Sequence, residues 1–201
     1  MNDSDSYLIE FRLADSADAS PAEFRYLFAA IDHLTRALTI EEMRRFVEGA
    51  DLSDRGRDEI FATLIHQGRH LAPPVQVVSV RRESPWSVVV GLSVATMLWA
   101  MRKMIAPEIL QAWGESRLKE NFKRFVRDGL FQGAREQIET TAAAKPQYGN
   151  LVIDDVAESG ASRPDRPSVT ISLKRTDVLQ VEIRDRDLMN EFLAKIGVRP
   201  K

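Results

Sequence analysis

The residues with the best spacing for chemistry are Glu59, His66 and His70, in a segment with helical periodicity. Two histidines four residues apart, with a carboxylate two turns earlier, can share one helix face and bind a metal ion. The only other histidine is His33, and no HExxH pattern is present to complete a zinc site. We therefore expect polar side chains near the end of a helix here, and no metal site.

Two serine patterns come close to nucleophile motifs. Residues 91–95 read GLSVA and follow three valines, as in a nucleophile elbow, but the final glycine is absent and every histidine precedes Ser93. Ser116 and Lys119 match SxxK without the motifs that accompany it in enzymes. The chain has no cysteine, which excludes thiolate nucleophiles and Cys-ligated metals. We predict a non-enzymatic protein without a cofactor.

A cationic cluster is the best predicted surface for an anionic ligand. Its members are Arg117, Lys123, Arg124 and Arg127. Phe122 and Phe125 lie between them, and anionic lipid or nucleic acid could use such a surface. Glu120 and Asp128 interrupt the cluster, and the formal net charge of −2 provides no long-range attraction for nucleic acid. Nucleic acid is therefore an unlikely partner, and an anionic membrane surface fits better.

The segment that differs most from its surroundings is the uncharged run 85–101, which covers 17 positions in a chain that is 29% charged. Its length favours a helix over residues 85–105 that begins after Ser84-Pro85. The alternative is that Val88, Val89 and Val90 form a buried strand. A wholly apolar helix must be covered by the protein's own core, by a partner chain or by lipid.

Small residues on that predicted helix indicate an interface. Ser87, Gly91 and Ala95 recur every four residues, a spacing that lets two helices approach closely, and Trp86 and Trp99 flank them. We expect a homo-oligomer or a protein partner at this face. The alternative is a peripheral or conditionally inserted membrane protein, because permanent spanning would export the acidic residues 1–83 without a signal sequence.

The remaining patterns predict an α+β fold. Alternating and β-branched residues predict strands at 7–13 and 75–81. Capping boxes at Ser20–Glu23 and Thr39–Glu42 predict helices from 21 to 38 and from 39 to 47, and a third helix is expected at 54–67. These elements form the predicted N-terminal unit, strand–three helices–strand, over residues 1–83.

The second half of the sequence predicts a central and a C-terminal unit. A long amphipathic basic helix is expected at 107–144, with Gly129 and Gly133 as points where it can split, so residues 84–145 are mainly helical. Strands at 151–156, 169–173 and 178–183 form a three-stranded meander with a closing helix at 187–196, in the unit 146–201. As an alternative, all the strands join in one sheet. The acidic N-terminus lacks an apolar signal region, so we expect a cytoplasmic protein.

Overall fold

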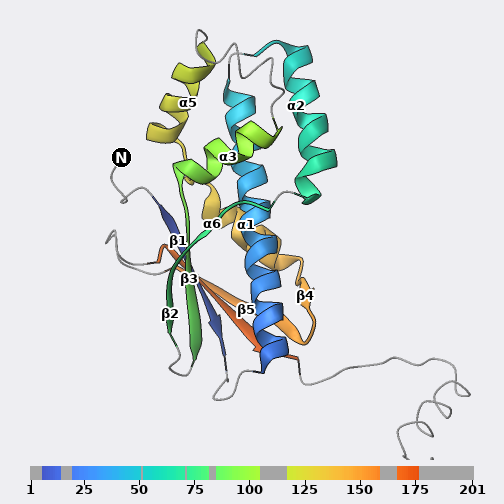
Figure 1. The fold of residues 1–201 in the computed structure, drawn as a ribbon, viewed down its shortest axis with the longest axis vertical. Coiled ribbons are helices and arrows are strands. Elements are labelled where there is room, and N and C mark those ends of the chain that lie inside the picture. The colour runs from blue at the N-terminus through green and yellow to red at the C-terminus, as the bar shows by residue number, and fades with distance from the viewer. Residues whose placement is uncertain are drawn as a thin grey trace, which may run out of the picture.

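A six-stranded mixed sheet and five α-helices make up the described part of the chain (Figure 1). The structure is a computed structural model that describes residues 6–14, 20–50, 52–70, 72–81, 85–104, 117–158 and 167–176. The strands are β1 (Tyr7–Leu13), β2 (Gln76–Arg81), β3 (Trp86–Leu92), β4 (Gln147–Tyr148), β5 (Leu151–Glu158) and β6 (Val169–Arg175). The helices are α1 (Pro21–Gly49), α2 (Asp54–Gln67), α3 (Val94–Met104), α5 (Arg117–Asp128) and α6 (Ala134–Ala143), with a one-turn 3₁₀ helix after α2. The predicted α+β class is confirmed.

The sheet joins strands from distant parts of the sequence. Its order is β2-β3-β1-β6-β5-β4, with β1 parallel to β6 and every other neighbouring pair antiparallel. β1 pairs along its whole length with β3, from Tyr7 opposite Leu92 to Leu13 opposite Trp86. The first strand of the sequence is therefore central, and β2 and β4 form the two edges.

Helix α1 is one continuous helix, where the sequence predicted two. The capping box at Ser20 is confirmed: the Ser20 Oγ accepts from the Glu23 N–H, and Glu23 accepts from the Ser20 N–H at 2.7 Å. The second predicted start, at Thr39, is wrong. The Thr39 hydroxyl donates instead to the carbonyl of Thr35 at 2.7 Å inside the helix, and the Glu42 carboxylate accepts from Arg45 in α1 and from the Phe131 N–H outside it. Buried residues on both sides of Thr39 keep the helix intact through packing.

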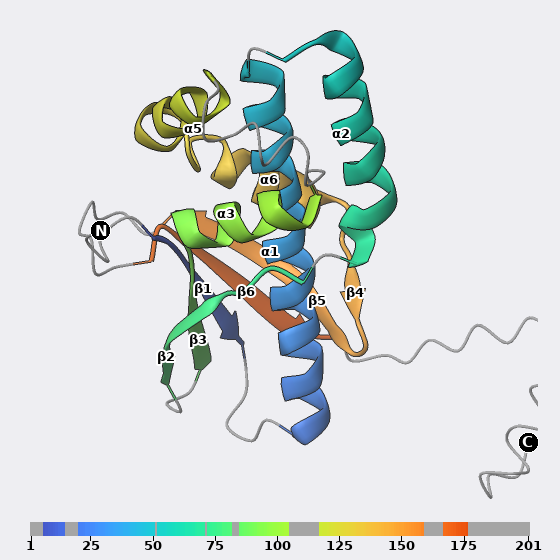
Figure 2. The ribbon, with the colours of Figure 1, turned by 45° about the horizontal axis from the view of Figure 1, so that its top comes forward.

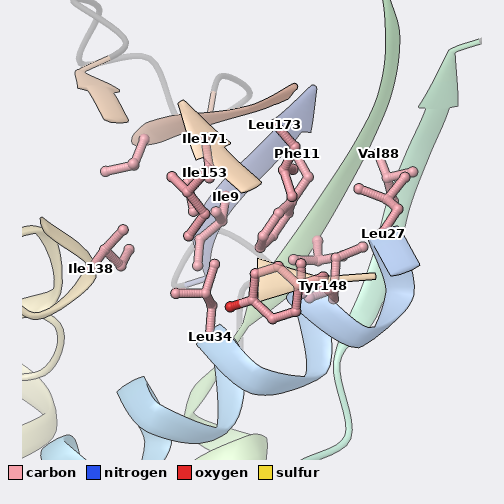
Figure 3. Packing of buried hydrophobic residues seen from close by; sticks show 14 of the residues in the cluster. Ile9, Phe11, Leu27, Leu34, Val88, Ile138, Tyr148, Ile153, Ile171 and Leu173 are labelled. Atoms are coloured by element: carbon pink, nitrogen blue, oxygen red, sulfur yellow. The ribbon is translucent and has the colours of Figure 1, made fainter. Parts of the chain in front are cut away.

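One hydrophobic cluster lies between α1 and the sheet. Figure 3 shows Ile9, Phe11 and Ile171 of the sheet near Leu27 and Leu34 of α1. All five are at most 1% exposed, and alternate strand residues supply them because successive side chains point to opposite faces. Helix α6 adds Ala134 and Ile138 to the same cluster. This cluster therefore fixes the position of the sheet beneath α1.

A second hydrophobic cluster lies among the helices at the C-terminal half of α1. Met43 and Phe46 of α1 form this cluster together with residues that include Ile60 of α2, Met101 of α3 and Phe122 of α5. Helix α1 is roughly 40 Å long, which is enough to belong to both clusters. Figure 2 shows α1 crossing the sheet and continuing upward beside α2.

The predicted helix over 85–105 is wrong, and the alternative of a buried strand is confirmed. Residues 86–92 form β3, which pairs with β1 on one side and β2 on the other, and α3 begins at Val94. Val88, Val90 and Leu92 are at most 1% exposed within this single chain. Pairing on both sides satisfies the backbone of β3 without any helical hydrogen bonds. No helix among the described residues is long and apolar enough to cross a bilayer.

Most of the other predicted elements are confirmed. Strand 7–13 and helix 54–67 have the predicted bounds, and strands 75–81, 151–156 and 169–173 differ from β2, β5 and β6 by one or two residues at an end. The basic helix splits at Gly129 and Gly133 into α5 and α6. Strand 178–183, helix 187–196 and the start of helix 107–144 lie outside the described residues. β4 was not predicted.

Glu23 connects the N-terminus of α1 to the sheet. Its side chain is 4% exposed and forms an ion pair with Arg175 of β6. Burial raises the pKa of Glu23, but the Ser20 N–H and the Arg175 guanidinium together hold the pKa below its usual value. A lowered folded-state pKa contributes stability that is present above the unfolded-state pKa and is lost as the pH falls through the folded-state pKa.

We therefore expect Glu23→Gln to destabilise the protein more at pH 7 than below the usual carboxyl pKa of about 4.3. Urea unfolding of both proteins across this pH range measures the difference, and other titrating groups cancel in the comparison. Glu48→Gln, which alters an exposed ion pair with Arg44, is the matched control and should change stability little. A penalty for Glu23→Gln that grows as the pH falls would contradict the assignment.

Candidate functional site

Strand β2 is an apolar edge strand. Among the described residues it pairs with β3 alone, and Figure 2 shows it at the margin of the sheet. Val77, Val78 and Val80 are 52%, 49% and 52% exposed, and they are three of the five exposed large apolar residues in the described part of the chain. The preceding Pro73-Pro74 cannot extend the ladder, because proline lacks the N–H donor. An extended apolar strand therefore borders the sheet with one side of its backbone free of any described strand.

A bulge at Val78 sets the direction of the β2 side chains. Val77 and Val80 lie opposite Val90 and Val88, whose side chains belong to the cluster under α1. The register shifts between Val77 and Ser79, so that Val78 is an extra residue. Because of this extra residue, Val77 and Val80 point to the same face although they are three positions apart.

The opposite face of β2 has a different composition. Gln76, Ser79 and Arg81 lie opposite residues of β3 that point away from α1. We call this side of the sheet the outward face. A Cβ at Gly91 would lie 3.6 Å from Val78 Cγ2, which places Val78 on this second face as well. The only charge on β2 is Arg81, at its end. Strand edges are commonly protected by lysine, proline or bulges, and β2 has the bulge but no charge between its valines.

An unpaired strand edge can bind an extended peptide. Alternate N–H and C=O groups along such an edge point away from the sheet and can hydrogen-bond an added strand. Side chains on the two faces then decide which sequences fit. The β-branched run after Pro73-Pro74 indicated a strand in the sequence. Whether its valines are exposed depends on the position of this strand in the sheet.

The structure does not bring the predicted helix-packing residues together on one face. Ser87 and Gly91 lie on the outward face of β3, and Trp86 lies on the other face, where its ring meets Phe24 edge-on at 4.8 Å. Ala95 is exposed on α3, and Trp99 packs at the margin of the helical cluster. The predicted face required one helix through all five positions, and the strand β3 separates them.

Ser87 has a local partner on the outward face of the sheet. Burial raises the pKa of Glu10, but hydrogen bonds from Arg12, Ser87 and Thr170 hold that pKa below its usual value. The distances from Glu10 Oε2 are 2.8 Å to Arg12 Nη2 and 3.3 Å to Thr170 Oγ1. This polar group stabilises the centre of the sheet.

The predicted anionic-ligand residues lie on α5. Lys123, Arg124 and Arg127 are exposed, and Arg117 is the first residue of the helix. Lys123 pairs with Glu120 at 2.9 Å, and Arg127 pairs with Asp128 at 2.6 Å. These carboxylates offset part of the positive charge.

The phenylalanines between the cations face the interior. The ring centroids of Phe122 and Phe125 lie 5.5 and 5.6 Å from the ring centroid of Phe46 in the helical cluster. A shallow groove of about 230 Å³ beside them is lined by Arg124, Asp128 and five other residues. Phe122 is therefore buried in the packing, whereas Phe125 is half-buried and lines the groove together with Arg124.

The motifs nearest to chemistry remain incomplete in the structure. Within the described ranges no cluster of His, Cys, Asp and Glu could hold a metal ion. Glu59 pairs with Arg55 at 3.1 Å, and His66 and His70 are exposed. Ser93 does stand between a strand and a helix, as in a nucleophile elbow. Its N–H donates to Thr96 Oγ1 at 3.3 Å, which places it at the start of α3.

A groove between α1 and α2 was not predicted from the sequence. It has a volume of about 380 Å³ and is lined by Ile40, Arg44, Glu48, Phe61, Leu64 and Ile65. Ile65 is 65% exposed there. Arg44 and Glu48 pair with each other at 3.0 Å along the rim.

Comparisons with models of protein families, with curated proteins and with solved structures give no match to this chain.

Proposed function

We propose that this chain is a non-enzymatic assembly or adaptor protein that binds an extended protein segment along the edge of β2 that no described strand pairs with. The observation that supports the proposal is the row of half-exposed valines, Val77, Val78 and Val80, on a strand with one described neighbour. Strand addition at a sheet edge is a recurring mode of peptide recognition.

The apolar run 85–101, which was the predicted binding surface, lies mostly in the interior of the chain. Val88, Val90 and Leu92 of β3, together with Met97 and Met101 of α3, are at most 2% exposed. These residues are covered by the chain's own packing, so they offer no surface to a partner. Strand β2 lies next to β3 in the same sheet, and its exposed valines are the apolar surface to which we assign partner binding.

Strand addition at β2 should be weak or moderate. Each main-chain hydrogen bond contributes about 0.5–1.5 kcal/mol net, and β2 has six residues. An added strand of this length buries less surface than the roughly 1,200 Å² of a stable interface. We expect dissociation constants in the micromolar range, on the order of 1–100 µM.

Labelled peptides of about seven residues that alternate valine and threonine test the proposal. Fluorescence anisotropy should show micromolar binding to the protein. N-methylation of alternate peptide bonds removes donors to the edge and should weaken binding at least about tenfold. The variant Val77→Lys with Val80→Lys should lose binding, while Ile65→Lys in the groove between α1 and α2 should retain it. Equal binding of methylated and unmethylated peptides would overturn the proposal.

Salt dependence distinguishes the alternatives on α5. Binding of phosphatidylserine vesicles or nucleic acid through Lys123, Arg124 and Arg127 would weaken steeply with added salt. Strand addition at β2 involves one charge, Arg81, and should respond little to salt. Vesicle co-sedimentation and nucleic-acid titration at low and high salt therefore separate these functions from the proposed one.

A further inference from the structure

We infer that the segment bound along β2 is β2 of a second copy of this chain, antiparallel to the first, with a two-fold axis between Val78 and Ser79. The inference rests on the proposed function, because it uses the same edge and names its occupant. It follows from the bulge, the side-chain faces of β2 and the position of its single charge.

The bulge makes β2 self-complementary about this axis. Two strands paired antiparallel place directly opposed side chains on the same face of the sheet. An axis between Val78 and Ser79 sets Val77 opposite Val80 of the second copy. In a regular strand, residues three apart point to opposite faces, which would forbid this pairing. The extra residue at Val78 puts Val77 and Val80 on one face and so permits it.

The other residues of β2 match in the same register. Gln76 meets Arg81 of the second copy, and both lie on the outward face. Val78 meets Ser79, again on the outward face. No two like charges oppose each other, because Arg81 is the only charged residue of the strand. Each copy also has two residues between Val77 and Val80, so the paired strands have equal lengths.

The neighbouring symmetric registers would oppose side chains that lie on different faces of the sheet. An axis through Val78 opposes Val77 to Ser79, and an axis through Ser79 opposes Val77 to Arg81. Both arrangements set an inward-facing residue against an outward-facing one. Axes one residue further out, between Val77 and Val78 or between Ser79 and Val80, create the same conflict at their centre. The register centred between Val78 and Ser79 matches every face along β2.

The paired edge would join the two sheets into one continuous sheet. Val77 and Val80 from each copy would form a group of four valines on the face that α1 covers further along the sheet. This contact is isologous, and it closes after two copies because each β2 edge is used once. The small area predicts a dimer that dissociates at micromolar concentration.

Sedimentation velocity of the full chain from about 1 to 300 µM tests the inference. The wild-type protein should shift from monomer to dimer within this range. Val77→Lys with Val80→Lys places like charges opposite each other twice and should weaken dimerisation at least about tenfold. Val77→Lys with Val80→Glu places opposite charges at the same positions and should dimerise at least about tenfold more tightly than the double-lysine variant. Circular dichroism checks that both variants fold.

The outcomes separate this inference from the proposed function. A wild-type chain that stays monomeric while peptides bind along β2 overturns the second copy as occupant and leaves the proposed function standing. Dimers that persist in the double-lysine variant place the contact elsewhere. Equal weakening in both charge variants overturns the register. A dimer lost with Ile65→Lys, and not with the β2 variants, assigns the contact to the groove between α1 and α2.

Discussion

Replacing Gly149 with alanine should destabilise the protein by about 3–5 kcal/mol. Gly149 is the first residue of the two-residue turn between β4 and β5, and its φ is +60°. A Cβ there would lie 2.2 Å from Cζ of Tyr26, inside van der Waals contact. The substitution therefore combines backbone strain with displacement of an aromatic ring that packs against the sheet cluster.

The surroundings of the turn increase the effect. Tyr148, beside Gly149, is 8% exposed, and its hydroxyl lies 2.6 Å from Nδ1 of His33 on α1. Burial raises the pKa of Tyr148 to about 12, so the phenol stays neutral at physiological pH. Displacement of the turn would disturb this contact between α1 and the edge of the sheet.

Urea unfolding at pH 7 measures the effect, and Gly49→Ala is the matched control. Gly49 ends α1 without a positive φ, and a Cβ at this position would have no neighbouring atom within 4 Å. Alanine there should therefore change stability by at most about 0.5 kcal/mol. In a Tyr26→Ala background, Gly149→Ala should cost less stability than in the wild type, because the clash with the Tyr26 ring is absent and only the backbone strain at Gly149 remains. Similar stability of Gly149→Ala and Gly49→Ala would show that the turn tolerates a side chain.

Replacing Glu42 with alanine should destabilise the protein by about 2–4 kcal/mol. Glu42 is fully buried on α1, and its carboxylate accepts from the N–H of Phe131 at 2.9 Å and from Arg45 at 2.8 Å. Phe131 has a φ of +62° in the link between α5 and α6 and stacks on Tyr7 of β1. Alanine would leave the Phe131 N–H without this acceptor, and the link would lose its contact with α1.

The Glu42→Gln variant separates the acceptor from the charge. Glutamine retains an oxygen for one of the two donors, so its cost should be smaller than that of alanine. Burial raises the pKa of Glu42 above its usual value, against the lowering effects of the Phe131 N–H and Arg45. A raised folded-state pKa contributes stability that is present below the unfolded-state pKa and is lost as the pH rises through the folded-state pKa.

The cost of Glu42→Gln should therefore be larger at about pH 4 than at pH 7, the reverse of the trend for Glu23→Gln. Urea unfolding of the wild type and the variant at both values measures the trend. A cost that grows toward pH 7 would mean that the pair with Arg45 outweighs burial and that the pKa is lowered.

Periodic and capping patterns predicted much of the fold. Strand 7–13 was predictable because apolar residues alternate with Glu10 and Arg12, and helix 54–67 because its apolar residues recur with helical spacing. The capping box at Thr39–Glu42 failed because the same residue types serve another purpose inside α1. Thr39 bonds the preceding turn, and Glu42 reaches Phe131, which is 89 positions away.

The candidate site was predictable only in part. The composition of 75–81 and the proline pair before it indicated a strand, and the exclusion of enzyme motifs directed attention to binding. The half-exposed valines could not be predicted, because the same sequence in the middle of the sheet would be buried. The bulge at Val78 also depends on the match between β2 and β3.

The sequence by itself determined the α+β class, most strand positions and the split between α5 and α6, because periodicity, prolines and glycines act within a few residues. Only the tertiary structure decided how the run 85–101 folds. An uninterrupted apolar run has no period that separates strand from helix. Its first half became β3 because β1 and β2 supply backbone partners on both sides, and its second half became α3 against the helical cluster.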